Sequence, residues 1–130
     1  MAQSLSSVGA VTLFVRDPQR SKEFYNRVFE LEPVFEDDKS VAFKLDNLFL
    51  NLLKRGVATN ELLGPVPEAE PGASFELTIW VDDADAACAE LEKRTVTIVN
   101  GPADRPWGMR SAAFLDPDGY VWEVAANLPQ

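Results

Sequence analysis

Hydrophobic and polar residues follow the same order in two parts of this 130-residue chain. Residues 11–17 read Val-Thr-Leu-Phe-Val-Arg-Asp and residues 77–83 read Leu-Thr-Ile-Trp-Val-Asp-Asp, so the two stretches lie 66 positions apart. Each stretch predicts a largely buried strand that ends at an aspartate and is followed by a helix-like segment. Two copies of a unit of about half the chain indicate a duplicated module, because a solenoid needs more and shorter repeats. A duplicated module tends to build its site between the two copies, so residues at equivalent positions are candidate site residues.

The first copy predicts the order strand, helix, strand, strand, strand. Asp17 and Pro18 are typical of a helix start, with a capping carboxylate followed by proline in the first turn. The helix is expected to run to about Glu30, and its spacing of three and four predicts a buried stripe of Phe24, Val28 and Leu31. The three later strands are expected at residues 34–36, 41–45 and 48–53.

The second copy repeats this order after a linker, residues 56–72, that is rich in glycine and proline. Asp83 is expected to cap a helix that runs through Lys93. The predicted strands are residues 75–81, 95–99, 111–115 and 120–125, with a loop at residues 101–108 and a turn at residues 116–119. The chain is therefore predicted to be one α+β domain with two βαβββ modules, residues 8–55 and 73–127.

The amino-acid composition excludes several classes of function and of site. The net charge of −9 argues against a nucleic-acid partner, which needs a basic face, and is compatible either with attraction of cationic ligands or with simple solubility. The absence of histidine excludes Ser-His-Asp and Cys-His catalysis. The single cysteine, Cys88, excludes an internal disulfide and is expected to be a small buried residue. No apolar run is long enough to span a membrane and the N-terminal residues do not resemble a signal peptide, so we expect a cytoplasmic protein.

The order of elements, the paired Thr-x-x-Val-x-Asp starts and the turn Asp116-Pro117-Asp118-Gly119 before Val121-Trp122-Glu123 resemble the vicinal oxygen chelate superfamily. That superfamily includes glyoxalase I, extradiol dioxygenases, bleomycin-resistance proteins and fosfomycin-resistance enzymes, and the resemblance extends over residues 8–126. It implies that the two βαβββ modules form half-open curled sheets around a cavity. It also implies a homodimer, since many members combine modules from two chains.

In the enzymes of that superfamily, four residues on the first and fourth strands of the two modules hold a divalent metal. The resemblance carries these positions to Ala10, Asn51, Glu76 and Glu123. Strand alternation favours Asn51 over its neighbours, because it leaves Leu48, Leu50 and Leu52 together on the helix-covered face. A methyl group cannot coordinate a metal, so the set is incomplete and no metal or other cofactor is expected. If a metal binds at all, its ligands are Asn51, Glu76 and Glu123.

Alternation also predicts which side chains share the face of these positions, and together they form an apolar, aromatic surface with few polar groups. The candidate ligand-binding residues are Thr12, Phe14, Phe49, Asn51, Glu76, Thr78, Trp80, Trp107, Arg110 and Glu123. Trp107 is included because its segment, Arg105-Pro106-Trp107-Gly108, resembles a segment near the ligand groove of bleomycin-resistance proteins. Two alternatives stay open: the aromatic residues fill a core, and Arg110 pairs with the two carboxylates.

Three functions fit these residues. The first is a metal-independent protein of the bleomycin-resistance type that sequesters a planar or cationic small molecule, as antibiotic-resistance proteins do; it needs no catalysis. The second is a divalent-metal-dependent glyoxalase-like lyase, isomerase or dioxygenase that uses Glu76 and Glu123. The third is a noncatalytic dimeric interaction module. The incomplete ligand set favours the first and leaves catalytic residues unassigned.

Overall fold

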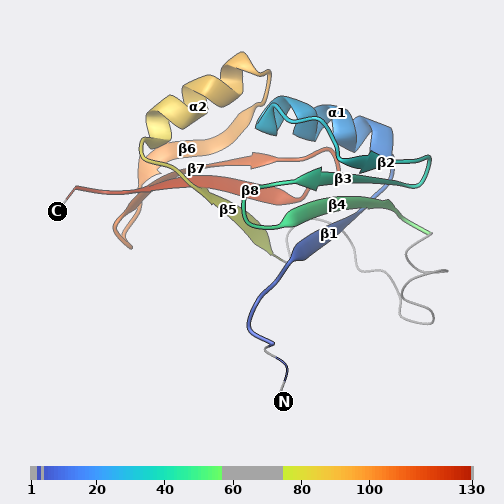
Figure 1. Ribbon diagram of the computed structural model, residues 1–130. Coiled ribbons are helices and arrows are strands. Elements are labelled where there is room, and N and C mark those ends of the chain that lie inside the picture. The colour runs from blue at the N-terminus through green and yellow to red at the C-terminus, as the bar shows by residue number, and fades with distance from the viewer. Residues whose placement is uncertain (1–2, 4, 57–74, 130) are drawn as a thin grey trace. The chain divides into compact units, whose positions relative to one another are not determined.

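The computed structural model describes residue 3, residues 5–56 and residues 75–129, and these form two four-stranded sheets and two helices (Figure 1). The elements are β1 (Ala10–Val15), α1 (Pro18–Phe29), β2 (Phe35–Glu36), β3 (Ser40–Lys44), β4 (Phe49–Lys54), β5 (Glu76–Trp80), α2 (Ala84–Lys93), β6 (Ile98–Asp104), β7 (Met109–Leu115) and β8 (Val121–Asn127). The predicted α+β fold with two βαβββ modules is confirmed. Apart from its first residue, the expected linker 56–72 lies outside the described residues.

The chain divides into two compact units, and residues 27–30, which include the last turn of α1, group with the second unit. The first strands of the two modules begin 66 residues apart, and so do the two helices, as the repeat predicts. In the described part of the chain, neither helix is long and apolar enough to cross a membrane.

The sheet of the first unit has the order β1-β4-β3-β2, with β1 parallel to β4 and the other pairs antiparallel. One face is buried and carries Leu13, Val15, Val41, Phe43, Leu50 and Leu52. The register places Asn51 beside Thr12 of β1 and Ala42 of β3, so these three side chains share the opposite face. The alternation argument for Asn51 is therefore confirmed.

Helix α1 begins as predicted, because the Asp17 carboxylate accepts hydrogen bonds from the backbone N–H groups of Gln19 and Arg20. Phe24 and Val28 are buried, but Leu31 is 39% exposed, and its assignment to the buried stripe is wrong. The helix ends at Phe29, and Leu31 lies beyond the last helical turn.

The sheet of the second unit has the order β5-β8-β7-β6, and helix α2 packs against β6, β7 and β8. Asp83 caps α2 as predicted, accepting a hydrogen bond from the Ala86 backbone N–H at 3.0 Å. The helix-covered face buries Ala112, Phe114, Trp122 and Val124 of the sheet with Ala84, Cys88 and Leu91 of the helix. Phe114 and Trp122 stack with ring centroids 6.2 Å apart.

Strand β6 differs most from the prediction. The expected strand 95–99 and loop 101–108 are wrong in part: β6 begins only at Ile98, and it continues through the first half of the expected loop to Asp104. It pairs with β7 through two register shifts. Gly101, at φ +88°, lies within the shifted region, where bulges absorb the irregular backbone of this edge strand. Thr95 is not in a strand, because at φ +62° it ends helix α2, and its N–H bonds to the carbonyl of Glu92.

Candidate functional site

Each unit contains a hydrogen bond between its first and last strands, on the face that the buried core leaves free. In the first unit, the Asn51 amide (Nδ2) donates to Thr12 Oγ1 at 3.4 Å. In the second unit, Thr78 Oγ1 donates to Glu123 Oε1 at 3.1 Å. The threonines are 66 residues apart and each lies directly opposite its partner in the register, so the two pairs are equivalent in the repeat. Both pairs are made of residues that the sequence had singled out.

The open face of the second sheet brings together four predicted site residues. Glu76, Thr78 and Trp80 alternate along β5 on one face, and Glu123 of β8 lies beside Thr78 on that same face. The Trp80 side chain is 71% exposed, so its indole is accessible to a ligand. Ala125 lies directly beside Trp80 in the register of β5 and β8. The alternative that Trp80 fills a core is therefore wrong for this residue.

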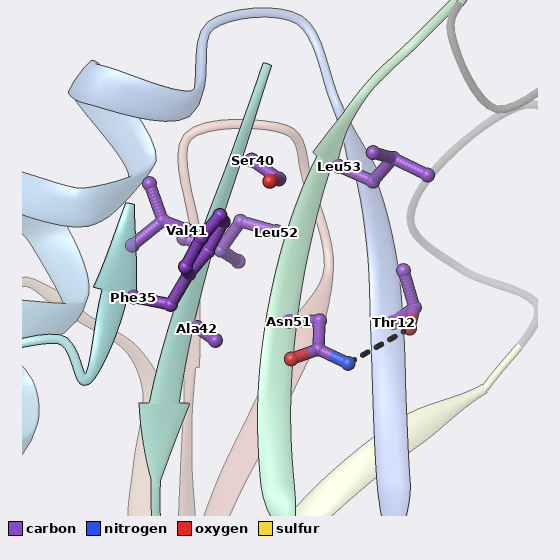
Figure 2. A pocket seen from close by; sticks show the side chains of 8 residues that line it. All are labelled: Thr12, Phe35, Ser40, Val41, Ala42, Asn51, Leu52 and Leu53. Atoms are coloured by element: carbon purple, nitrogen blue, oxygen red, sulfur yellow. Dashed lines mark hydrogen bonds between the residues drawn. The ribbon is translucent and has the colours of Figure 1, made fainter. Parts of the chain in front are cut away.

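The first unit has a pocket of about 240 Å³ on the face that carries Asn51 (Figure 2). Thr12 and Asn51 line it with Phe35, Ser40, Val41, Ala42, Leu52 and Leu53. The Asn51 side-chain carbonyl points toward Ala42, whereas its amide faces Thr12. Phe14 and Phe49 lie on the same face but do not line this pocket. Sequence reasoning missed Phe35, Ser40 and Ala42, although alternation along β3 places Ser40 and Ala42 on the face of Asn51.

Arg110 is not brought to the carboxylates of the open face. It lies on the opposite face of β7, where its Nε and Nη2 donate to the Asp85 carboxylate of α2 at 3.0 and 3.1 Å. Its Nη1 donates to Asp104 at 2.9 Å. These hydrogen bonds, that with Asp85 first, raise the pKa of Arg110 above its ordinary value. The alternative that Arg110 pairs with Glu76 and Glu123 is wrong, because both of its partners lie elsewhere.

Trp107 lies in the tight turn between β6 and β7 and is 67% exposed. The turn is closed by backbone hydrogen bonds from Arg105 to Met109 and from Gly108 to Arg105. No ring contact joins Trp107 to Trp80 among the residues that the structure describes. Trp107 therefore forms no ring pair with Trp80 in the described part of the chain.

A residue of the same turn that was not predicted, Arg105, does reach the open face. Its Nε donates to Ser111 Oγ at 3.1 Å, and its Nη2 donates to the Ser111 carbonyl at 3.2 Å and to Asn100 Oδ1 at 3.3 Å. Ser111 alternates with Arg110, so its side chain lies on the face of Glu123. The only sequence signal was its place in the Arg-Pro-Trp-Gly segment.

The four positions that the resemblance assigns to a metal do not fit a divalent ion. Ala10 offers only a methyl group, and Asn51 offers one neutral oxygen. Glu76 and Glu123 are the two remaining carboxylates, and Glu123 already accepts the Thr78 hydroxyl. No group of three or more His, Cys, Asp or Glu residues within 5–56 and 75–129 could hold a metal ion. These four positions therefore offer fewer metal ligands than the full set that the resemblance implies.

Comparison with solved structures finds the same fold in several proteins. A glyoxalase/bleomycin resistance protein/dioxygenase from Nocardioides superposes with a TM-score of 0.85 at 24% identity, over 98% of this chain and 87% of that one. An integron cassette protein from the mobile metagenome of V. cholerae gives a TM-score of 0.73 at 27% identity, over 97% and 98% of the two chains. A lactoylglutathione lyase from Agrobacterium tumefaciens gives 0.72 at 23% identity, over 95% of each chain.

The sequence profile of one family also matches most of the chain. It is described as the Glyoxalase/Bleomycin resistance protein/Dioxygenase superfamily, and the match covers residues 7–124. That range extends from before β1 into β8 and includes Glu76, Thr78, Trp80 and Glu123. The chain therefore belongs to the Glyoxalase/Bleomycin resistance protein/Dioxygenase superfamily.

Proposed function

We propose that this protein binds a planar or cationic small molecule on the open face of its second sheet, without a metal ion. The observation that carries the proposal is the exposed indole of Trp80 beside two carboxylates, Glu76 and Glu123. Within the described residues, no lysine or arginine forms an ion pair with either carboxylate. A cationic ring can stack on the indole while the carboxylates neutralise its charge.

The Thr78 hydroxyl contributes by fixing the direction of the Glu123 carboxylate. It donates to Oε1, so Oε2 stays available to a ligand. An acceptor that is already oriented loses less side-chain freedom when the ligand binds. The overall charge of −9 adds a long-range attraction for cations, which weakens with added salt.

The pocket of the first unit supports the same kind of ligand chemistry without charge. Its walls are mainly apolar, and Asn51 offers one carbonyl oxygen to a donor. At about 240 Å³ it is smaller than the pockets that hold drug-sized molecules. We assign it to a small apolar ring, or to part of a larger compound.

Proflavine, a planar cation, is a suitable probe, and its fluorescence reports binding directly. We expect W80A and E123Q each to weaken proflavine binding by roughly two- to thirtyfold, which corresponds to the range of cation–π and charge contributions. E92Q removes the same charge from the exposed side of α2, away from the open face, and should leave the affinity unchanged. Equal affinities for the wild type, W80A and E123Q would exclude the open face as the binding surface.

The metal-dependent alternative makes a different prediction, because a lyase, isomerase or dioxygenase that uses Glu76 and Glu123 needs a retained divalent ion. Elemental analysis of protein purified without chelator decides between the two. About one equivalent of a single ion, lost together with catalytic activity in E123Q, would replace our proposal. Proflavine binding that is unchanged by a chelator supports it.

A further inference from the structure

We propose that Arg105 binds a carboxylate, so that the ligand of the open face is a zwitterion whose amine lies at Glu123 and whose carboxylate lies at Arg105. This inference rests on the proposed function, since it assigns the chemistry of that ligand. It concerns a residue that carries no role in the binding surface described so far.

Arg105 differs from Arg94 and Arg110, which both form ion pairs. Arg94 pairs with Glu30 and Glu90, and Arg110 pairs with Asp85 and Asp104, each through two carboxylates. No carboxylate of the described residues lies within ion-pair distance of Arg105. In a chain of net charge −9, an arginine that is partly buried and yet lacks an acidic partner is available for an anion from outside.

The guanidinium of Arg105 is held by neutral oxygens only. Ser111 Oγ and the Ser111 carbonyl accept from Nε and Nη2, and Asn100 Oδ1 accepts from Nη2. The two N–H groups of Nη1 make no hydrogen bond to the described residues. These contacts orient the group without neutralising its charge, which is the arrangement that a charge-assisted bond to a carboxylate requires.

The backbone at Gly101 lies so close to Arg105 and Ser111 that it has no space for a side chain. A Cβ atom on Gly101 would lie 2.5 Å from the Ser111 carbonyl oxygen and 3.1 Å from Arg105 Nη2. Any other residue at position 101 would therefore push against the guanidinium or against the strand that holds it. The glycine and the arginine form one local arrangement that keeps the positive charge against Ser111.

The face of β7 and β8 between Arg105 and Glu123 carries no other charge. Ala113 lies directly beside Glu123, and the buried Ala125 lies beside Ser111, so no charged side chain of these two strands separates the positive and the negative group. Ser111 and Glu123 are diagonal neighbours on this face, and such neighbours lie roughly 7–8 Å apart in a sheet. A small molecule with an amine and a carboxylate a few bonds apart fits between them. A monoanionic carboxylate suits this position better than phosphate, because a single guanidinium offers one unit of positive charge.

A pair of probes that differ only by a carboxylate tests the inference. L-phenylalanine and phenethylamine share the ring and the amine, and both can be titrated while the backbone amide shifts of β7 and β8 are followed by NMR. We expect wild-type protein to bind L-phenylalanine about tenfold to a hundredfold more tightly than phenethylamine, as a charge-assisted hydrogen bond would provide. In R105Q this preference should vanish, while the affinity for phenethylamine stays the same. R20Q removes the same charge from the exposed side of α1 and should keep the preference.

The comparison of the two probes on wild-type protein does not depend on whether any variant folds. R105K is a second variant, which keeps the positive charge but loses the planar guanidinium. If phenethylamine binds in a Glu123-dependent manner but L-phenylalanine binds no more tightly, Arg105 has no such role and the proposed function stands. The same conclusion follows if R105Q retains the preference for L-phenylalanine. If neither compound shifts the amides of β7 and β8, the proposed binding surface fails and the inference fails with it.

Discussion

Replacing Gly101 with alanine tests how strongly the arrangement around Arg105 is built into the fold. Gly101 has φ +88°, a conformation that costs an L-residue about 1–2 kcal/mol. Its new Cβ would also meet the Ser111 carbonyl oxygen at 2.5 Å, a distance at which the backbone itself must shift. Crowding of this kind costs about 1–3 kcal/mol. We therefore expect G101A to lower the free energy of unfolding by about 2–5 kcal/mol.

Gly108 provides a matched control for the steric part of this cost. It has φ +84°, and a Cβ placed on it meets nothing within 4 Å. G108A should therefore lose only the conformational part, about 1–2 kcal/mol. The two variants should differ by the crowding at Gly101, which corresponds to a melting-temperature difference of roughly 4–12 °C for a domain of this size.

Thermal unfolding followed by circular dichroism and by calorimetry measures both variants under the same conditions. G101A should also lose the preference for L-phenylalanine over phenethylamine, because displacing the Ser111 backbone moves the oxygens that hold Arg105. If G101A melts at the same temperature as G108A, the close approach at Gly101 does not constrain the strand. The geometric argument for a fixed Arg105 would then be refuted.

Two further predictions concern stability. Hydrogen bonds from Lys22 and Gln19 lower the pKa of Glu36 below its ordinary value of 4.5, so this carboxylate stabilises the folded state above pH 4.5 and the contribution is lost as the pH falls. The free energy of unfolding, measured by urea titration between about pH 6 and pH 3, should therefore fall less steeply with pH for E36Q than for the wild type. An identical dependence on pH in the two proteins would contradict this. Arg94 donates to the Val28 carbonyl at 2.7 Å, so R94M, which keeps the aliphatic volume, should cost about 1–3 kcal/mol in urea unfolding, and a loss below about 0.3 kcal/mol would show that this bond adds nothing.

The sequence predicts most of the fold because its signals are local. Aspartates at helix starts and an Asp-Pro-Asp-Gly turn fix the ends of elements through their own hydrogen bonds, as Asp83 and Asp116 do. Alternation was enough to place Asn51 on the face of Thr12, since β1 and β4 pair without a bulge. The 66-residue repeat then relates the first strand and the helix of one module to those of the other.

The position of Arg110 could also have been predicted, by counting across the turn that joins β7 to β8. Leu115 pairs with Val121, so Ala113 pairs with Glu123 and Arg110 pairs with Ala126. Arg110 therefore shares the face of Trp122, which is buried under the helix. The error came from judging closeness along the chain instead of following the alternation.

Arg105 could not be placed in this way. Between Ile98 and Ala103, strand β6 shifts its register twice, and each shift changes which face the following residues occupy. Only the path of the backbone through Gly101 decides that Arg105 reaches Ser111. The residue that we assign to the ligand's carboxylate is thus the one that a sequence pattern could least locate.

The two equivalent pairs explain why we place charge recognition in the second module. In the first, the Asn51 amide donates to Thr12, so the asparagine presents a neutral carbonyl to its pocket. In the second, the hydrogen bond runs in the opposite direction, from the Thr78 hydroxyl to Oε1 of the Glu123 carboxylate. The same backbone position therefore serves an uncharged contact in one copy and a charged one in the other. An E123Q variant, which gives the second copy a neutral amide like that of the first, should lose selectivity for amines while keeping affinity for neutral rings.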